Sequence, residues 1–363
     1  MRSGLPALTA RPGSSRIARW AAVTIAVGLL LTACGSDTQT QPEPEALTVG
    51  PTIDPSKGAA PAPVVPATWP LTGVAGEPAA RPALAVKIEN TNVARPQTGL
   101  DQADVVWETI VEFDVSRFVA VFQSQVPAEV GPIRSVRPMD ASIIAPLHGL
   151  IAYSGGQPGI LALIQGSGAQ SISHDAGAPG LYRISSRAAP HNVYGSPQTF
   201  WDQADASHQA PPPEQFAFAR SADRATAVAA GSPATTLAFD LSPASNPSWS
   251  WDGTSWLRSE GSVPAMVASG ARISATNVVS ITADHPGTGF GAQNGAIVPT
   301  YNLVGSGDGV LATGGKTIAV RWQKDADDAP MRLFLPDGTP ALLAPGNTWV
   351  ELVPAGSGSL TVS

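Results

Sequence analysis

Short apolar runs separated by polar loops recur along the chain from about residue 80 onward. Three runs rich in Val, Ile, Ala and Phe predict buried β-strands at residues 83–89, 117–123 and 150–153. Apolar segments that follow polar loops predict helices at residues 101–113, 140–150, 160–165 and 198–206. Strands that alternate with helices indicate an α/β fold with a mainly parallel sheet.

The pattern changes after the three prolines at residues 211–213, which mark a domain boundary. The apolar runs are then shorter, and Asp-Gly dipeptides between several of them are a strong hairpin signal. They predict strands at residues 237–241, 249–251, 256–258, 278–281, 301–304, 317–322, 331–335 and 349–353. We therefore expect an α/β domain over residues 70–210 and a β-rich domain over residues 214–358.

Residues 1–33 predict a secretory signal peptide, because four arginines precede an apolar run from Trp20 to Leu31 that is too short to span a membrane. The run leads into Leu31-Thr32-Ala33-Cys34-Gly35, which resembles a bacterial lipobox. The resemblance implies cleavage before Cys34, attachment of diacylglycerol to it, and a chain anchored to the extracytoplasmic face of the cell membrane. The alternative is an ordinary signal with a chance cysteine.

Residues 34–69, rich in Thr, Gln, Pro and Ala, predict a disordered tether.

The chain is acidic. It has 21 basic and 28 acidic residues, and loss of the four N-terminal arginines leaves 17 against 28, a net charge of −11. This balance argues against nucleic acid or an anionic membrane surface as the main partner. The histidines show no metal-ligand spacing, and no nucleotide, NAD or haem motif occurs, so we expect neither a metal nor a cofactor.

Polar loops follow each of the three strands predicted in the first domain. In an open α/β sheet, ligands bind in the crevice at the carboxyl ends of the strands, and these loops emerge there. The third loop is a glycine-rich helix start whose free N–H groups favour an anion. The residues expected to line the crevice are Asn90, Arg95, Arg134, Ser135, Arg137, Gly155, Gly156, His191 and Asn192.

The central loop is Gly131-Pro132-Ile133-Arg134-Ser135-Val136-Arg137-Pro138, in which glycine and proline restrict the backbone. Its two guanidinium groups suit bidentate recognition of a phosphate or carboxylate. Alternatively, they bond loop carbonyls and acidic side chains and serve the architecture alone.

Three acidic residues lie four positions apart on the helix predicted first: Asp104, Glu108 and Glu112. Like charges at this spacing repel mildly, so an unpaired stack is unfavourable. Arg117, Arg134 and Arg137 are natural partners if that face meets the sheet edge. The alternative is a solvated acidic face.

Candidates for catalysis are few, because neither a Gly-x-Ser-x-Gly nor a Ser-x-x-Lys motif is present. Glu112 and His191 are the candidate acid/base residues, although His191 follows a proline in a turn and can equally hold that turn by hydrogen bonding. The tryptophans of the second domain form either a glycan-stacking surface or core packing: Trp249, Trp251, Trp256, Trp322 and Trp349.

Several motifs resemble those of the YerB-like bacterial lipoproteins, the DUF3048 family, in the same order over roughly residues 69 to 355. They include Val86-Lys87-Ile88-Glu89-Asn90, Ala103-Asp104-Val105-Val106-Trp107-Glu108, the Gly131 to Pro138 loop, Ala189-Pro190-His191-Asn192 and Pro345-Gly346-Asn347-Thr348-Trp349-Val350. The resemblance implies an exported, lipid-anchored protein with N- and C-terminal domains, and it carries no established activity. Tyr153-Ser154 stands where the family tends to have a histidine before the glycines.

Three functions remain open from the sequence. The first is binding of an anionic envelope ligand or a protein partner at the strand-end loops, with the lipid on Cys34 holding the chain to the membrane. The second is a cell-wall hydrolase or transferase that uses Glu112 or His191. The third is a scaffold for cell-wall synthesis proteins. The sequence determines neither the ligand nor the oligomeric state.

Overall fold

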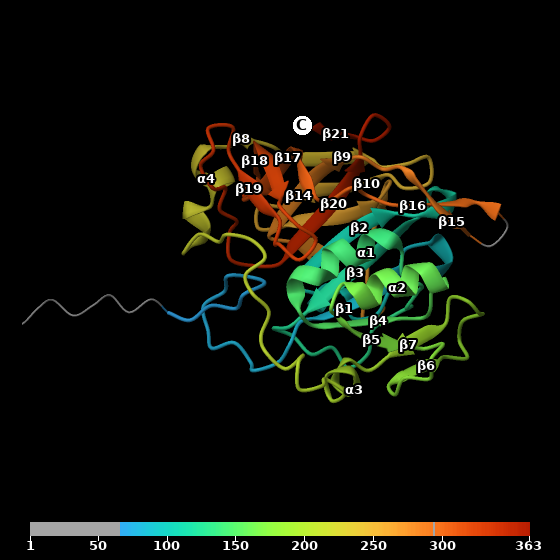
Figure 1. Cartoon of the computed structure of the whole chain (residues 1–363). Coiled ribbons are helices and arrows are strands. Elements are labelled where there is room, and N and C mark those ends of the chain that lie inside the picture. Colours follow the sequence, from blue (N-terminus) through green and yellow to red (C-terminus); the bar gives the residue numbers. More distant parts are fainter. Residues whose placement is uncertain (1–65, 293–294) are drawn as a thin grey trace, which may run out of the picture. The chain divides into compact units, whose positions relative to one another are not determined.

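A computed structural model describes residues 66–292 and 295–363 (Figure 1). The predicted signal peptide, Cys34 and nearly all of the predicted tether lie outside the described residues. Strands dominate the described part, and the α-helices are short: α1 (Pro138–Ile144), α2 (Pro158–Gly166), α3 (Pro197–Trp201) and α4 (Thr226–Ala230). Single 3-10 turns occur at Asn92–Ala94, Leu100–Gln102, Glu112–Asp114, Ala145–Leu147 and Ala222–Arg224.

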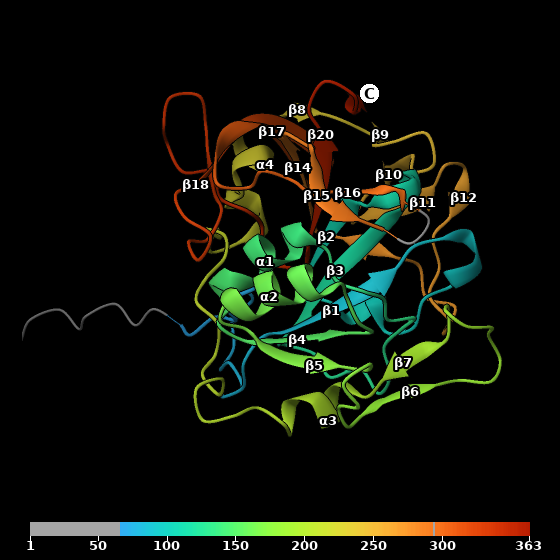
Figure 2. The same ribbon diagram turned by 45° about the vertical axis from the view of Figure 1, so that its right-hand side comes forward.

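The main sheet has 11 strands in the order β19-β18-β17-β14-β20-β2-β3-β1-β4-β5, with β8 paired to β18. Its strands are β1 (Leu84–Glu89), β2 (Val105–Ile110), β3 (Ser116–Phe122), β4 (Leu150–Tyr153), β5 (Gln170–Ser173), β8 (Ser232–Pro233), β14 (Asn277–Ala283), β17 (Gly305–Thr313), β18 (Lys316–Lys324), β19 (Arg332–Phe334) and β20 (Thr348–Pro354). The helices α1 and α2 lie side by side next to β1 and β4 in both views (Figures 1 and 2).

The sheet is mixed, so the expectation of a mainly parallel sheet is wrong. β1 runs parallel to β4, and β4 to β5, but β3 is antiparallel to both β1 and β2. The cause is local. The segment predicted as a helix from Asp101 to Phe113 instead forms β2, which pairs with β3 as a hairpin. A spacing of four places acidic residues on one face of a helix, but it also places them on one face of a strand, whose period is two. The sequence pattern alone does not separate the two.

One sheet runs through both predicted domains, because β2 from the first half pairs in parallel with β20 from the second half. The domain boundaries proposed from the sequence remain a prediction. Most strands predicted in the second half are present, but residues 301–304 form no strand. Two hairpin-like ribbons complete the fold: β6 (Leu181–Arg183) with β7 (Val193–Gly195), and β15 (Gly287–Gly291) with β16 (Ile297–Pro299).

A smaller sheet of six strands carries a buried arginine that contacts the main sheet. Its order is β12-β11-β10-β9-β21, with β13 paired to β11: β9 (Thr236–Asp240), β10 (Pro247–Trp251), β11 (Trp256–Glu260), β12 (Val263–Pro264), β13 (Ser274–Ala275) and β21 (Ser359–Val362). Arg258 of β11 is fully buried and donates to Glu108 of β2 at 2.6 Å and to Glu351 of β20 at 2.7 Å. Its guanidinium carbon lies 4.8 Å from the centre of the Trp349 ring. This cluster joins the two sheets.

The burial of the tryptophans decides between the two uses considered for them. Trp249, Trp256, Trp322 and Trp349 are each at most 3% exposed, and Trp251 is partly buried against the core. Trp249 and Trp349 pack edge to face, with ring centres 5.2 Å apart. Of the two alternatives, core packing is therefore the one that the structure shows at these positions, and a glycan-stacking surface is not.

Candidate functional site

The loop Gly131 to Pro138 continues the main sheet between the ends of β1 and β4. The Arg134 N–H donates to the Lys87 carbonyl of β1 at 2.8 Å, and the Arg134 carbonyl accepts from the N–H of Ser154, just after β4, at 3.0 Å. Glycine is required at the start of the loop, because a Cβ on Gly131 would lie 2.5 Å from the Tyr194 ring. The loop is thereby held at the carboxyl edge of two parallel strands.

At this edge the loop lines a cleft of about 600 Å³, which we call the arginine cleft. Loops after β1, β3 and β4 contribute to it, together with the turn between β2 and β3 and the segment around residue 190. Its charged and titratable residues are Arg117, Arg134, Arg137, Arg183, Glu89, Glu112, Asp175 and His191. Arginine is the prevailing charge, although the protein as a whole is acidic.

Glu112 forms ion pairs with two of the arginines. Arg137 donates from Nε to Glu112 Oε2 at 2.6 Å and from Nη2 to Oε1, and Arg117 Nη2 lies 3.5 Å from the same Oε1. Burial opposes the charge of Glu112, but the hydrogen bonds from Arg137 and the positive charges of both arginines outweigh it and lower its pKa to about 2. The expected pairing of Glu112 with Arg117 and Arg137 is confirmed. Glu112 is therefore held ionised, which does not suit a general acid.

The other two acidic residues of the predicted stack lie elsewhere. Glu108 bonds Arg258 in the cluster between the sheets. The Asp104 carboxylate accepts from the N–H groups of Gln123 at 2.6 Å and Ser124 at 2.8 Å, and from the Ser124 hydroxyl. The three acids thus serve three separate clusters, because the segment is a strand and a turn instead of a helix.

Arg134 is paired less completely than Arg137. Its Nε lies 3.4 Å from Glu89 Oε2, and neither atom has a hydrogen-bond partner among the described residues. The only hydrogen bond of its side chain within the described chain runs from Nη1 to the Pro190 carbonyl at 3.3 Å, and this side chain is 21% exposed. Arg134 therefore keeps free donor capacity in the cleft.

Glu89 and His191 form a hydrogen-bonded pair in the cleft wall. Glu89 is 1% exposed, and its Oε1 accepts from Thr91 Oγ at 2.7 Å and lies 2.8 Å from His191 Nδ1. When Glu89 is ionised its oxygens only accept, and His191 Nδ1 is then the donor in this pair. Glu89 was not among the site residues expected from the sequence. Its place at the end of the first predicted strand was the available signal.

A second buried pair supports the loop from beneath. Lys87 Nζ donates to Asp140 Oδ1 at 2.7 Å, and both side chains are fully buried. Burial lowers the pKa of Lys87 to about 8, against the attraction of Asp140. The other oxygen of Asp140 accepts from the Arg137 N–H at 2.7 Å, which caps α1 and fixes the end of the loop.

The remaining predicted site residues divide between the cleft and its supports. Ser135 and Gly156 line the cleft, whereas Gly155 does not and uses its carbonyl to accept from the Val136 N–H. Asn192 accepts from Arg183 Nη1 at 2.7 Å and so positions an arginine of the cleft.

Asn90 and Arg95 lie outside the cleft. Asn90 is 2% exposed and donates to Ser116 and Glu260, and Arg95 Nη2 lies 3.1 Å from Glu260 Oε2. Both tie the first loop to β11, so they stabilise the fold. The expectation that they line the crevice is wrong, because the first loop turns toward the second sheet.

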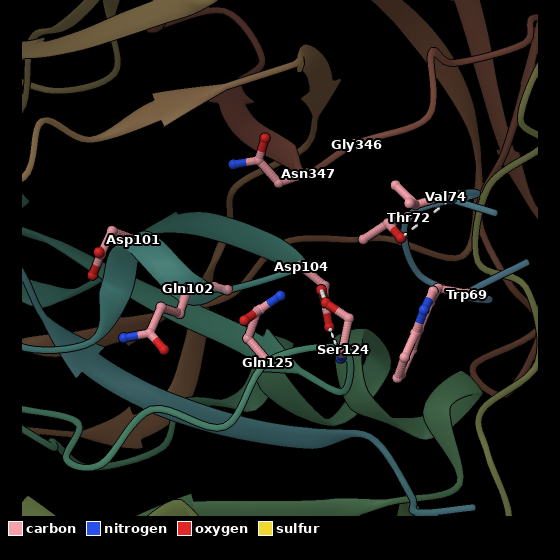
Figure 3. Close-up of a pocket in the computed structure, with 11 residues that line it drawn as sticks. Trp69, Thr72, Val74, Asp101, Gln102, Asp104, Ser124, Gln125, Gly346 and Asn347 are labelled. Atoms are coloured by element: carbon pink, nitrogen blue, oxygen red, sulfur yellow. Dashed lines mark hydrogen bonds between the residues drawn. The ribbon is translucent and has the colours of Figure 1, made fainter. Parts of the chain in front are cut away.

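A smaller cavity of about 280 Å³ lies near Asp104 and contains Trp69, Gln125 and Asn347 in its lining (Figure 3). The Asp104 carboxylate is fully occupied by its bonds to residues 123 and 124. The other charged residue in the lining is the exposed Asp101, so the cavity offers no positive charge to an anion and is a weaker candidate than the arginine cleft.

Residues 66–292 and 295–363 contain no cluster of three or more His, Cys, Asp or Glu side chains that could hold a metal. No helix in this part of the chain is long and apolar enough to cross a membrane.

Comparison with known proteins shows the family. Residues 71–210 match the profile described as "Protein of unknown function (DUF3048) N-terminal domain", and residues 236–350 match the C-terminal domain of the same description. The chain belongs to the DUF3048 family. This DUF3048 chain is 36% identical over 131 residues to the "Putative lipoprotein YerB" of Bacillus subtilis (strain 168). That match covers 35% of this chain and 39% of the relative, well under two thirds of its length.

The DUF3048 fold is also seen in a solved structure. The crystal structure of YerB protein from Bacillus subtilis matches with a TM-score of 0.68 over 81% of this chain and 99% of that chain. The identity is 24%, so this likeness shows the fold alone.

Proposed function

We propose that this DUF3048 protein is a lipid-anchored protein of the cell envelope that binds an anionic ligand, or an acidic segment of a protein partner, in the arginine cleft. The lipobox-like segment at Cys34 and the name of the Bacillus subtilis relative support the anchor on the extracytoplasmic face of the membrane. The lipid, and not a basic surface, holds the acidic chain at the membrane.

The incomplete pairing of Arg134 carries the binding proposal. Arg137 and Arg117 are engaged by Glu112, but Arg134 has one long hydrogen bond and an offset ion pair. A guanidinium with free N–H groups in a cleft matches a phosphate or carboxylate in geometry and charge. Arg183 lies in the same cleft with one hydrogen bond, to Asn192, and adds to the positive field.

Replacing Arg134 by alanine should weaken binding of small anions roughly 10- to 100-fold, since a hydrogen bond to a charged group contributes about 1.5–3 kcal/mol. The measurement is calorimetric titration of the exported chain with inorganic phosphate and with N-acetylmuramic acid at low salt. Arg321→Ala is the matched control, because Arg321 is exposed, does not line the cleft and is paired with Asp308. Equal affinities for Arg134→Ala and the parent protein would remove the proposal.

The Glu89–His191 pair favours a second function, hydrolysis or group transfer on cell-wall material. A histidine whose Nδ1 is held by a buried carboxylate presents Nε2 for proton transfer. His191 replaces Glu112 as the candidate base, since both Glu112 oxygens accept from Arg137 and a pKa of about 2 makes this carboxylate a weak base. The scaffold hypothesis remains a prediction without a specific contact to support it.

The test of this second function is incubation of the protein with purified cell-wall fragments, followed by mass spectrometry of the products. Release of new fragments by the parent protein, lost by at least about 100-fold in both Glu89→Gln and His191→Gln, is the outcome expected of general base catalysis. No change in the fragment pattern with the parent protein would leave binding as the function.

A further inference from the structure

The turn between β2 and β3 adopts a backbone that its residues disfavour. Phe113 has φ 65° and Asp114 has φ 57°, two consecutive residues in the left-handed region without a glycine. Three residues, Glu112 to Asp114, lie between the hydrogen-bonded Val111 and Val115, and a bulky side chain at positive φ is an outlier. Local preference therefore does not explain phenylalanine at this position.

Contacts from other parts of the fold hold the turn in place. The Val111 N–H donates to the Val115 carbonyl at 2.9 Å and closes the turn. Ser242 Oγ donates to the Asp114 carbonyl at 2.6 Å, and the Glu112 carboxylate is bound by Arg137. A strained backbone conformation is found where contacts with the surrounding structure hold the residue in it, and such residues cluster at binding sites.

Packing does not explain Phe113 either. The residue is 60% exposed, and it lines the arginine cleft together with Arg134 and His191. A phenylalanine whose backbone is strained and whose ring is exposed to solvent contributes little to the core. Its evident property is a flat apolar face presented to the cleft.

The rest of the cleft offers groups that suit hydroxyls. Ser135 and Ser154 lie in the wall with their Oγ atoms 3.2 Å apart, and the Asp175 side chain is 68% exposed. Gln157 also contributes to the lining. A sugar ring has both kinds of surface, since hydroxyls lie around its edge and polarised C–H bonds on one face are attracted to the negative face of an aromatic ring.

We propose that Phe113 is the stacking platform for a sugar ring whose acidic substituent binds Arg134, so that the ligand of the cleft is an acidic saccharide. This inference rests on the proposed function and adds the ligand class to it. The acidic group is a carboxylate or a phosphate, and a cleft of about 600 Å³ has room for one or two sugar rings.

The experiment compares Phe113→Gly with Phe113→Trp by calorimetric titration, using three probes. N-acetylmuramic acid carries a sugar carboxylate, N-acetylglucosamine 1-phosphate carries a sugar phosphate, and inorganic phosphate lacks the ring. We expect Phe113→Gly to weaken binding of at least one sugar acid roughly tenfold and to change phosphate affinity less than about twofold. Phe113→Trp should retain the affinity, and the sugar acid that responds identifies the acidic group.

Thermal unfolding of the same variants separates a contact from a structural role. Glycine accepts the left-handed backbone, so Phe113→Gly should leave Tm unchanged or raise it by about 2 °C. A clear fall in Tm would overturn the inference, because Phe113 would then be packing. Val93→Ala is the control, an exposed apolar side chain that does not line the cleft, and it should leave all affinities unchanged.

The remaining outcomes distinguish this inference from the function on which it rests. If Arg134→Ala abolishes binding but Phe113→Gly keeps full affinity for every sugar acid, the saccharide inference fails and anion binding survives. Tighter binding of uridine monophosphate than of either sugar acid would also overturn the saccharide inference, because Phe113 would then stack on a nucleobase and not on a sugar ring. If no probe binds the parent protein, or Arg134→Ala changes nothing, the proposed function itself fails.

Discussion

Arg258→Leu should destabilise the protein by about 3–5 kcal/mol, the largest effect that we expect from a single substitution. The guanidinium is fully buried and within 3.1 Å of Glu108, Glu260 and Glu351. Leucine fills part of the volume but leaves the fully buried Glu108 carboxylate without its cationic partner. The measurement is the midpoint of urea unfolding at neutral pH, followed by tryptophan fluorescence, since Trp249 and Trp349 pack on the guanidinium.

Control variants show whether the lost charge of Arg258 causes the expected destabilisation. Burial and the negative charge of Glu108 raise the pKa of Glu351 well above its usual value, which favours the neutral form of its carboxyl group. Glu351→Gln should therefore cost only about 1 kcal/mol, and Glu108→Gln should cost clearly more. Arg321→Ala, at an exposed ion pair, should cost about 0.5 kcal/mol or less. Similar losses for Arg258→Leu and Arg321→Ala would contradict the assignment of Arg258 as the joint between the sheets.

Glu112→Gln should make stability less sensitive to acid. The folded protein holds the pKa of Glu112 at about 2, below the ordinary 4.5. A depressed carboxyl pKa stabilises the fold above pH 4.5, and this contribution is lost as the pH falls from 4.5 to 2. It amounts to on the order of 2 kcal/mol once solvent screening at the cleft is allowed for. The variant lacks it at every pH.

Urea unfolding at pH 7, 4.5, 3 and 2.5 measures this effect. The parent protein should lose more stability than Glu112→Gln across the lower part of the range, and the two curves should converge at the acid end. Asp308→Asn is the control, because Asp308 is exposed and pairs only with Arg321, and it should keep the slope of the parent. Parallel curves for Glu112→Gln and the parent would show that the Glu112–Arg137 pair contributes no net stability.

Local sequence patterns were sufficient for most strands near the cleft. The runs at 83–89, 117–123 and 150–153 correspond to β1, β3 and β4 within one residue at each end. Each run is apolar, bounded by polar or turn-forming residues and buried along its whole length, so its ends are defined by composition alone. The helices predicted from residues 140 and 160 begin two residues earlier, at Pro138 and Pro158, because proline suits the first helical position.

β2 shows where local patterns failed. Its six residues are buried on both faces, between β3 and a strand more than 200 positions later. The spacing of four between Asp104, Glu108 and Glu112 suited a helix. No local feature of the sequence predicted the parallel pairing of β2 with β20. Because the helix was predicted to end at Phe113, the sequence did not reveal that this residue lies in a strained turn.

The sequence by itself determined the arginine loop, the strands that lead to it and the expectation that polar residues meet at their carboxyl ends. The tertiary structure alone decided which guanidinium is neutralised. Arg137 meets Glu112, 25 positions away, and Arg134 lies beside Glu89, whose other oxygen is taken by a histidine 102 positions farther along. The physical reason is that ion pairing depends on distances of a few ångströms between side chains. Strand order and register bring those side chains together across the fold, and spacing along the chain does not encode them.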